Sequence, residues 1–129
     1  MVGTDEEDRP VASTYVGLEV FAASFERFQY EHAWIGACIG ELSLGPRGGG
    51  ILEFQHATLF ALPDSSAHEV HGEILAHYLQ HGGPGGQLGY PLSNEKGTPT
   101  GNGRYNTFEG GTVGWMPATG AFRIGETGL

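Results

Sequence analysis

The stretch AHEVHGEILAHYLQHGGPGGQLGYPLSNE, residues 67–95, decides the fold of this chain. It carries bulky apolar side chains at helical spacing, at Ile74, Leu75, Tyr78 and Leu79. This spacing places them along one stripe of a short helix. The Gly-Gly-Pro at 82–84 is expected to end that helix near His81, because glycine adopts the left-handed conformation of a helix C-terminus and proline cannot continue the helix.

The next feature is the tetrapeptide Leu88-Gly89-Tyr90-Pro91, which predicts a packed corner. Gly89 has no Cβ to hold the backbone away from its neighbours, and Pro91 stiffens the exit. A strand-like segment, FEGGTVGWMPATGA at 108–121, completes the unit. The expected unit is therefore a helix, a corner and a hairpin.

This pattern resembles the LGFP repeat, whose signature stands here as Leu88-Gly89-Tyr90-Pro91. The resemblance extends over small, aromatic and acidic positions at fixed offsets: Gly72, Ile74, Gly82, Gly83, Pro84, Glu95, Phe108, Gly111, Trp115, Pro117, Gly120 and Ala121. It covers the later part of the chain well and the beginning weakly. It implies an envelope-associated anchoring module, built from units that resemble blades of a propeller-like ring.

The chain also contains an internal sequence repeat. A shift of 54 residues places Phe54 on Phe108 and Thr58 on Thr112, and a shift of 53 places Ile35-Gly36 on Leu88-Gly89. The first copy is degenerate, with Ile-Gly-Ala-Cys at 35–38 in place of Leu-Gly-Tyr-Pro and Ala61 in place of Trp115. A helix-plus-hairpin unit cannot bury its apolar face alone, so two copies are expected to pack on each other.

We therefore predict an α+β fold, in which two tandem helix-plus-β-hairpin repeats pack as one compact domain with propeller-blade-like units. The domain is expected at 14–129, with the degenerate repeat at about 18–70 and the well-formed repeat at about 71–129. Helical spacing of Phe21, Phe25 and Phe28 predicts a first helix over about 18–33. Hairpins are expected at 51–60 and 104–115.

Composition restricts the partners. The chain has 129 residues and a formal net charge of −9 with six Lys and Arg, so it offers no basic face to nucleic acid or to an anionic membrane surface. No apolar run reaches the roughly 18 residues of a membrane span. Cys38 is the only cysteine, which excludes an intramolecular disulfide, and we expect it to be a buried small apolar residue.

The N-terminus carries four acids, at 5–8, within a leader at 1–13 that we expect to be flexible. It lacks the basic start and apolar stretch of an export signal. The localisation therefore stays open: the cytoplasm, or an envelope or secreted location for a chain whose signal has been removed, as the family resemblance suggests.

Histidines supply one candidate site. His68 and His71 lie three residues apart, and His77 and His81 four apart, spacings that bring side chains together on a helix. A zinc site is one interpretation, but no third ligand stands beside these pairs. We expect no metal and no cofactor, and we interpret these histidines as surface or hydrogen-bonded residues.

Glutamates supply a second candidate site. Glu69 or Glu95 beside His68 or His71 could act as a general acid–base set, and this is the catalytic alternative. Glu41 and Glu95 occupy equivalent positions, however, and are interpreted as repeat architecture that accepts backbone N–H groups of the corner. No nucleophile elbow or phosphate-binding loop is present, so an enzyme is not the leading interpretation.

Carbohydrate contact suits the remaining polar and aromatic residues better. Sugars present apolar C–H faces and many hydroxyl groups, so their sites combine an aromatic plate with amides, acids and arginine. The candidate ligand-binding residues are Tyr90, Glu95, Arg104, Tyr105, Asn106 and Trp115. Trp115 could equally fill the core between the units.

Three functions follow from the sequence. The first is a non-catalytic LGFP-type module that binds cell-envelope polysaccharide, such as arabinogalactan or a peptidoglycan-like glycan, through the second repeat. The second is a small enzyme with a His/Glu cluster in a pocket between the repeats. The third is a structural or protein-interaction unit, which includes self-association into a homo-oligomer.

Overall fold

The computed structural model describes residues 8–99 and 101–124, with side chains from residue 18 onward. Its first half contains α1 (Asp8–Glu31), β1 (Ser43–Leu44), β2 (Gly50–Glu53), β3 (Thr58–Ala61) and β4 (His68–Val70). Its second half contains α2 (Gly72–Gln80), β5 (Lys96–Gly97), β6 (Arg104–Phe108), β7 (Gly111–Met116) and β8 (Gly120–Ile124). Short 3₁₀ turns occupy Ala33–Ile35, Pro46–Gly48 and Gly83–Gly85. The predicted α+β class is confirmed.

Each half forms one antiparallel four-stranded sheet, in the orders β1-β2-β3-β4 and β5-β6-β7-β8. The predicted hairpins are the central pairs, β2–β3 and β6–β7. Their registers are equivalent, because Leu52 pairs with Leu59 as Asn106 pairs with Val113. The sequence prediction named only these hairpins and lacked the outer strands β1, β4, β5 and β8. β1 and β5 have two residues each, too few to show a periodic pattern.

The two corners are built in the same way, although only the second keeps the full motif. Gly36 and Gly89 both have a positive φ, of 85° and 69°, which favours glycine. The side chain of Gln55 accepts a hydrogen bond from the Ala37 N–H over 3.0 Å, and Glu109 accepts one from the Tyr90 N–H over 2.8 Å. The acid that binds the corner is thus Glu109, and the expectation that Glu41 and Glu95 do so is wrong.

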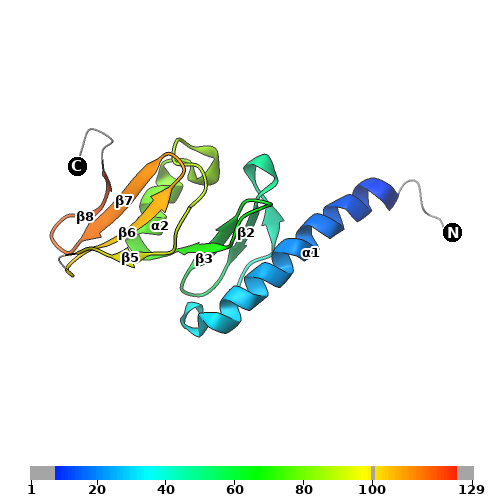
Figure 1. Cartoon of the computed structure of the whole chain (residues 1–129), viewed down its shortest axis with the longest axis horizontal. Helices are drawn as coiled ribbons and strands as arrows, with labels where there is room; N and C mark the ends of the chain where they lie inside the picture. The colour runs from blue at the N-terminus through cyan, green and yellow to red at the C-terminus, as the bar shows by residue number, and fades with distance from the viewer. Residues whose placement is uncertain (1–7, 100, 125–129) are drawn as a thin grey trace.

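Helices and sheets alternate through the molecule (Figure 1). The three phenylalanines of α1 pack on one face of the first sheet, and α2 packs between the two sheets. The ring of Tyr78 in α2 contacts Phe60 of β3 at 5.2 Å between centroids and Phe108 of β6 at 4.5 Å. Consequently β3 is buried on both faces, with Leu59 in the first core cluster and Phe60 in the second.

Three hydrogen bonds of Glu69 join β4 to the second half. Asn94 Oδ1 accepts a bond from the Glu69 N–H over 3.1 Å, and Asn106 Nδ2 donates to the Glu69 carbonyl oxygen over 3.0 Å. The Glu95 N–H donates to Glu69 Oε2 over 2.8 Å. These bonds fix the end of β4, and therefore His71 after it, against the second sheet.

Several local expectations can be compared with the structure. α2 ends at Gln80 and Gly82 is left-handed, as predicted. α1 begins at Asp8 instead of about residue 18, so residues 8–13 of the expected leader are helical and residues 1–7 lie outside the described part. The prediction that Cys38 is buried is wrong: it is exposed, because it follows the corner at the sheet edge. Neither helix in residues 8–99 is long and apolar enough to cross a membrane.

Candidate functional site

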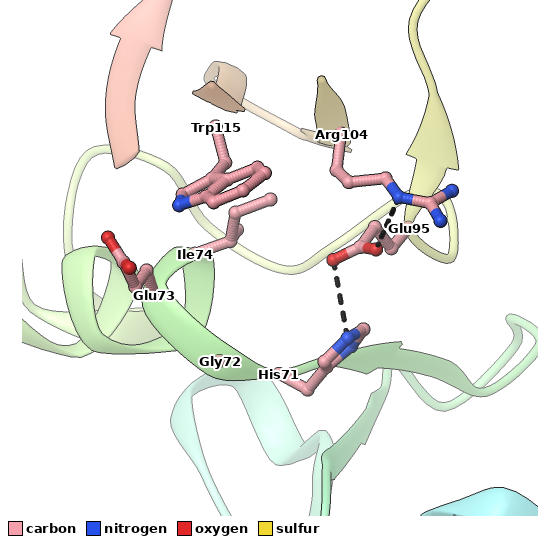
Figure 2. Close-up of a pocket in the computed structure, with 7 residues that line it drawn as sticks. All are labelled: His71, Gly72, Glu73, Ile74, Glu95, Arg104 and Trp115. Atoms are coloured by element: carbon pink, nitrogen blue, oxygen red, sulfur yellow. Dashed lines mark ion pairs between the residues drawn. The ribbon is translucent and has the colours of Figure 1, made fainter. Parts of the chain in front are cut away.

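A pocket of about 320 Å³ opens where the N-terminus of α2 meets the second sheet (Figure 2). One wall comes from the start of α2 and the residue before it, and the other comes from β6, β7 and the segment before β5. The lining residues are His71, Gly72, Glu73, Ile74, Glu95, Arg104 and Trp115. All of them belong to the region that the sequence analysis selected as the well-formed repeat.

Glu69 lies behind the pocket and pairs by a hydrogen bond with His71, which lines it. They are two residues apart across the end of β4, so their side chains point to the same side. His71 Nδ1 is 2.7 Å from Glu69 Oε1. The Glu69 side chain is only 4% exposed, whereas the His71 side chain is 29% exposed. The buried carboxylate therefore orients an imidazole that remains accessible from the pocket.

Glu95 lies on the far side of the imidazole and connects it to Arg104. His71 Nε2 is 3.5 Å from Glu95 Oε1, and Arg104 Nε is 3.6 Å from Glu95 Oε2 (Figure 2). The Glu95 side chain is 15% exposed and that of Arg104 is 58% exposed. The result is a continuous row of alternating charge, from Glu69 through His71 and Glu95 to Arg104.

Two groups in this row, His71 and Glu95, have shifted pKa values. The hydrogen bond with Glu69 raises the pKa of His71, against an opposing effect of burial. Burial raises the pKa of Glu95, although the nearby His71 partly offsets this. Both groups therefore hold their protons to higher pH than isolated side chains do. A ligand in the pocket would meet hydrogen-bond donors as well as acceptors.

Trp115 supplies the aromatic wall. It pairs across the hairpin with Arg104, so both side chains stand on the same face of the sheet, the one that α2 covers. One part of the indole packs on the core cluster around Tyr78, and another part lines the pocket beside Ile74. Both interpretations of Trp115, as core and as pocket wall, therefore apply to this one residue.

Three of the predicted ligand-binding residues lie away from the pocket. Tyr90 is 1% exposed and its hydroxyl donates to the Pro46 carbonyl over 2.6 Å. Asn106 is fully buried and donates to backbone carbonyls of Glu69 and Ser93. Tyr105 points to the opposite face of the sheet from its neighbour Arg104. Glu95, Arg104 and Trp115 are the predicted residues that the fold brings together.

The proposed catalytic set is also divided. Glu69, His71 and Glu95 meet, but His68 lies in β4 at a different cavity, where its Nδ1 is 3.3 Å from Asn94 Oδ1. Burial lowers the pKa of His68. His77 and His81 stack their rings at 4.2 Å between centroids at the C-terminal end of α2. Within residues 8–99 and 101–124, no group of three or more His, Cys, Asp or Glu side chains is placed to hold a metal ion.

Sequence reasoning considered His71 for a zinc site and for the catalytic alternative, not for ligand binding, and did not assign Gly72, Glu73 and Ile74 to the site. The alternation of Glu69, Val70 and His71 in a short strand would have indicated that Glu69 and His71 share a side. The approach of α2 to Trp115 could not be found in this way, because it depends on how α2 packs against the second sheet.

Comparison with known families adds one finding. The LGFP repeat model matches the chain twice, at residues 35–86 and 88–128, which are two tandem repeats. Each match begins one residue before a corner glycine, Gly36 or Gly89. The first match therefore has α2 near its end, and the pocket is lined by residues of both matches. No curated protein matches the chain.

Proposed function

Because the chain belongs to the LGFP repeat family, as two tandem repeats, we propose that it is a non-catalytic module that binds cell-envelope polysaccharide in the pocket between them. LGFP repeats are repeat modules that are often associated with the cell wall. The proposed contacts are Trp115, Glu95 and Arg104, together with His71.

The observation that carries this proposal is the combination of a partly buried indole with polar groups in one open pocket. Trp115 offers a flat apolar surface to the C–H face of a sugar ring. Glu95 and His71 offer an acceptor and a donor to hydroxyl groups at the edge of such a ring. Small-molecule sites typically combine an apolar or aromatic wall with fixed polar groups, and this pocket places Trp115 and Ile74 beside four polar side chains.

The charge of the pocket favours a neutral glycan over a polyanion. The guanidinium of Arg104 already faces Glu95 at 3.6 Å, and Glu73 adds a second carboxylate to the wall. A polyanionic ligand would meet these carboxylates without a surplus of cations to compensate them. Hydroxyl-rich neutral sugars meet no such repulsion.

Cosedimentation with purified arabinogalactan or insoluble peptidoglycan tests the proposal. The wild-type chain is expected to be retained, and Trp115→Ala is expected to lose most of this retention. Tyr30→Ala is the matched control, because Tyr30 is an aromatic residue of α1 that is 87% exposed and outside the pocket. No retention of the wild-type chain on either polymer would refute the proposal.

The Glu69–His71–Glu95 row supports a second candidate, a small enzyme that hydrolyses the bound glycan. A carboxylate that orients an imidazole, which in turn faces a second carboxylate, is an arrangement suited to general acid–base catalysis. The test is release of reducing ends from arabinogalactan over time by the wild-type chain and by His71→Gln. Release that disappears in the variant would favour the enzyme, and polymer that is bound without release would exclude it.

A further inference from the structure

We propose that the binding pocket continues past His71 into a second subsite whose aromatic plate is Trp34, so that the ligand is an internal segment of an extended polysaccharide. This inference rests on the proposed function, because it extends the same site. It adds Trp34, which stands directly before the first matched repeat, and specifies the form of the ligand, a chain of several sugar units instead of a single terminal sugar.

A second cavity adjoins the first. Its volume is about 530 Å³, and it is lined by residues of the first sheet's hairpin, by Trp34 and by Leu75 of α2. It shares His71 and Gly72 with the pocket described above. A Cβ added at Gly72 would meet no atom within 4 Å, so open space borders the backbone that the two cavities share. The two cavities therefore form one groove with His71 at its middle.

Trp34 is placed as a plate for this groove. It lies in the 3₁₀ turn Ala33–Ile35, whose last residue is fully buried in the first core cluster and anchors the turn. Trp34 as a whole is 47% exposed. Its ring meets that of His71 edge-on, at 4.9 Å between centroids and 65° between planes. An indole that is held by a rigid turn and left half in water is suited to stack on a sugar ring.

The polar lining of the second cavity repeats the chemistry of the first. Glu53, Gln55 and His56 are exposed around Trp34 and provide a carboxylate, an amide and an imidazole. His71 serves both halves of the groove: its Nε2 faces Glu95, and its ring contacts Trp34. The chain has two tryptophans, and both line this groove, one on each side of His71.

Chain-length dependence is the first test. Arabinogalactan fragments of two, four and six sugar units, separated by size, are titrated by calorimetry against the wild-type chain, Trp34→Ala and Trp115→Ala. The wild-type affinity is expected to rise about two- to tenfold from the shortest to the longest fragment, as the second plate is engaged. Trp34→Ala should abolish this gain and keep the affinity for the two-unit fragment. Trp115→Ala should weaken binding of every fragment.

Fluorescence gives an independent measurement, because each single substitution leaves one tryptophan as reporter. In Trp115→Phe, which keeps an aromatic plate, the emission of Trp34 should shift with the six-unit fragment and stay unchanged with the two-unit fragment. In Trp34→Phe, the emission of Trp115 should shift with both.

The outcomes separate the two proposals. The second subsite is overturned, and the proposed function stands, if binding depends on Trp115 and two further results are obtained. These are a gain of affinity with fragment length that Trp34→Ala does not alter, and a Trp34 emission that no fragment shifts. Absence of binding to every fragment and to the intact polymers would overturn both.

Discussion

The imidazole of His71 donates a hydrogen bond from Nδ1 to the buried carboxylate of Glu69, over 2.7 Å. This bond leaves Nε2 directed at the pocket, toward Glu95. The same carboxylate accepts the backbone N–H of Glu95 through its other oxygen. One buried side chain therefore positions both an imidazole and a second carboxylate at the site, and it belongs to β4, in the first of the two repeats.

The first prediction concerns Glu69→Gln. Glutamine has one acceptor oxygen in place of two, so only one of the two donors, His71 Nδ1–H or the Glu95 N–H, keeps an acceptor, and that acceptor is a neutral amide. We expect the free energy of unfolding in urea to fall by about 1–3 kcal/mol. Glu41→Gln, at an exposed glutamate, is the control and should stay close to the wild type. Equal stability of the two variants would contradict the role given to Glu69.

The second prediction is a pH dependence that His71 contributes. Its pKa is raised in the folded chain by the hydrogen bond with Glu69, above the unfolded value of about 6.5. The stabilisation by the charged imidazole is thus fully present below about pH 6.5 and is lost as pH rises through the raised pKa. The difference in unfolding free energy between the wild type and His71→Gln should be largest at acidic pH and shrink toward alkaline pH. His56→Gln, at an exposed histidine, is the matched control. A difference that is constant with pH would refute this.

The third prediction concerns Asn106, which is buried behind the site. Its amide donates to the Glu69 and Ser93 carbonyl oxygens, each over 3.0 Å, and so links β4, the corner segment and β6. Asn106→Ala leaves both acceptors without this donor, and we expect a loss of about 2–4 kcal/mol in unfolding free energy. Asn102→Ala, in an exposed turn, should have little effect. Similar urea midpoints for the two variants would be evidence against this buried link.

The fourth prediction compares two adjacent glycines. A Cβ at Gly49 would overlap the ring of Tyr90, and a Cβ at Gly48 would meet nothing within 4 Å. Gly49→Ala must displace that ring and its hydroxyl bond to Pro46, at an expected cost of about 3 kcal/mol. Gly48→Ala bears only the strain of its φ of 75°, about 1 kcal/mol. Thermal unfolding of both variants measures the difference, and a reversed order would show that the ring is loosely held.

The sequence predicted the architecture because its strongest signals are local. The Gly-Gly-Pro after α2 and the corner at Gly89 act over a few residues, and the equivalence of Phe54 and Phe108 follows from spacing alone. The degenerate corner at Gly36 was also found by spacing, and it folds alike because Gln55 makes the bond that Glu109 makes in the second repeat.

The site was predicted only in part. The alternation of residues along a strand does not tell how far a side chain lies from the edge of the sheet. Arg104 and Asn106 stand on the same face of β6, but Asn106 pairs with Val113 at the centre of the sheet and is buried, whereas Arg104 lies at its end. Alternation identifies the face and says nothing of the distance from the edge. Trp34 was missed because its contact with His71 joins residues that are remote in sequence.

The position of Tyr78 between Phe60 and Phe108 has a practical consequence for dissecting the molecule. A gene fragment that stops before residue 88 would retain α2 but uncover one side of its central ring, and a fragment that starts there would lack that helix altogether. The smallest piece that folds should therefore contain both repeats, and binding studies that aim to assign the glycan to one repeat are better done with point substitutions than with truncations.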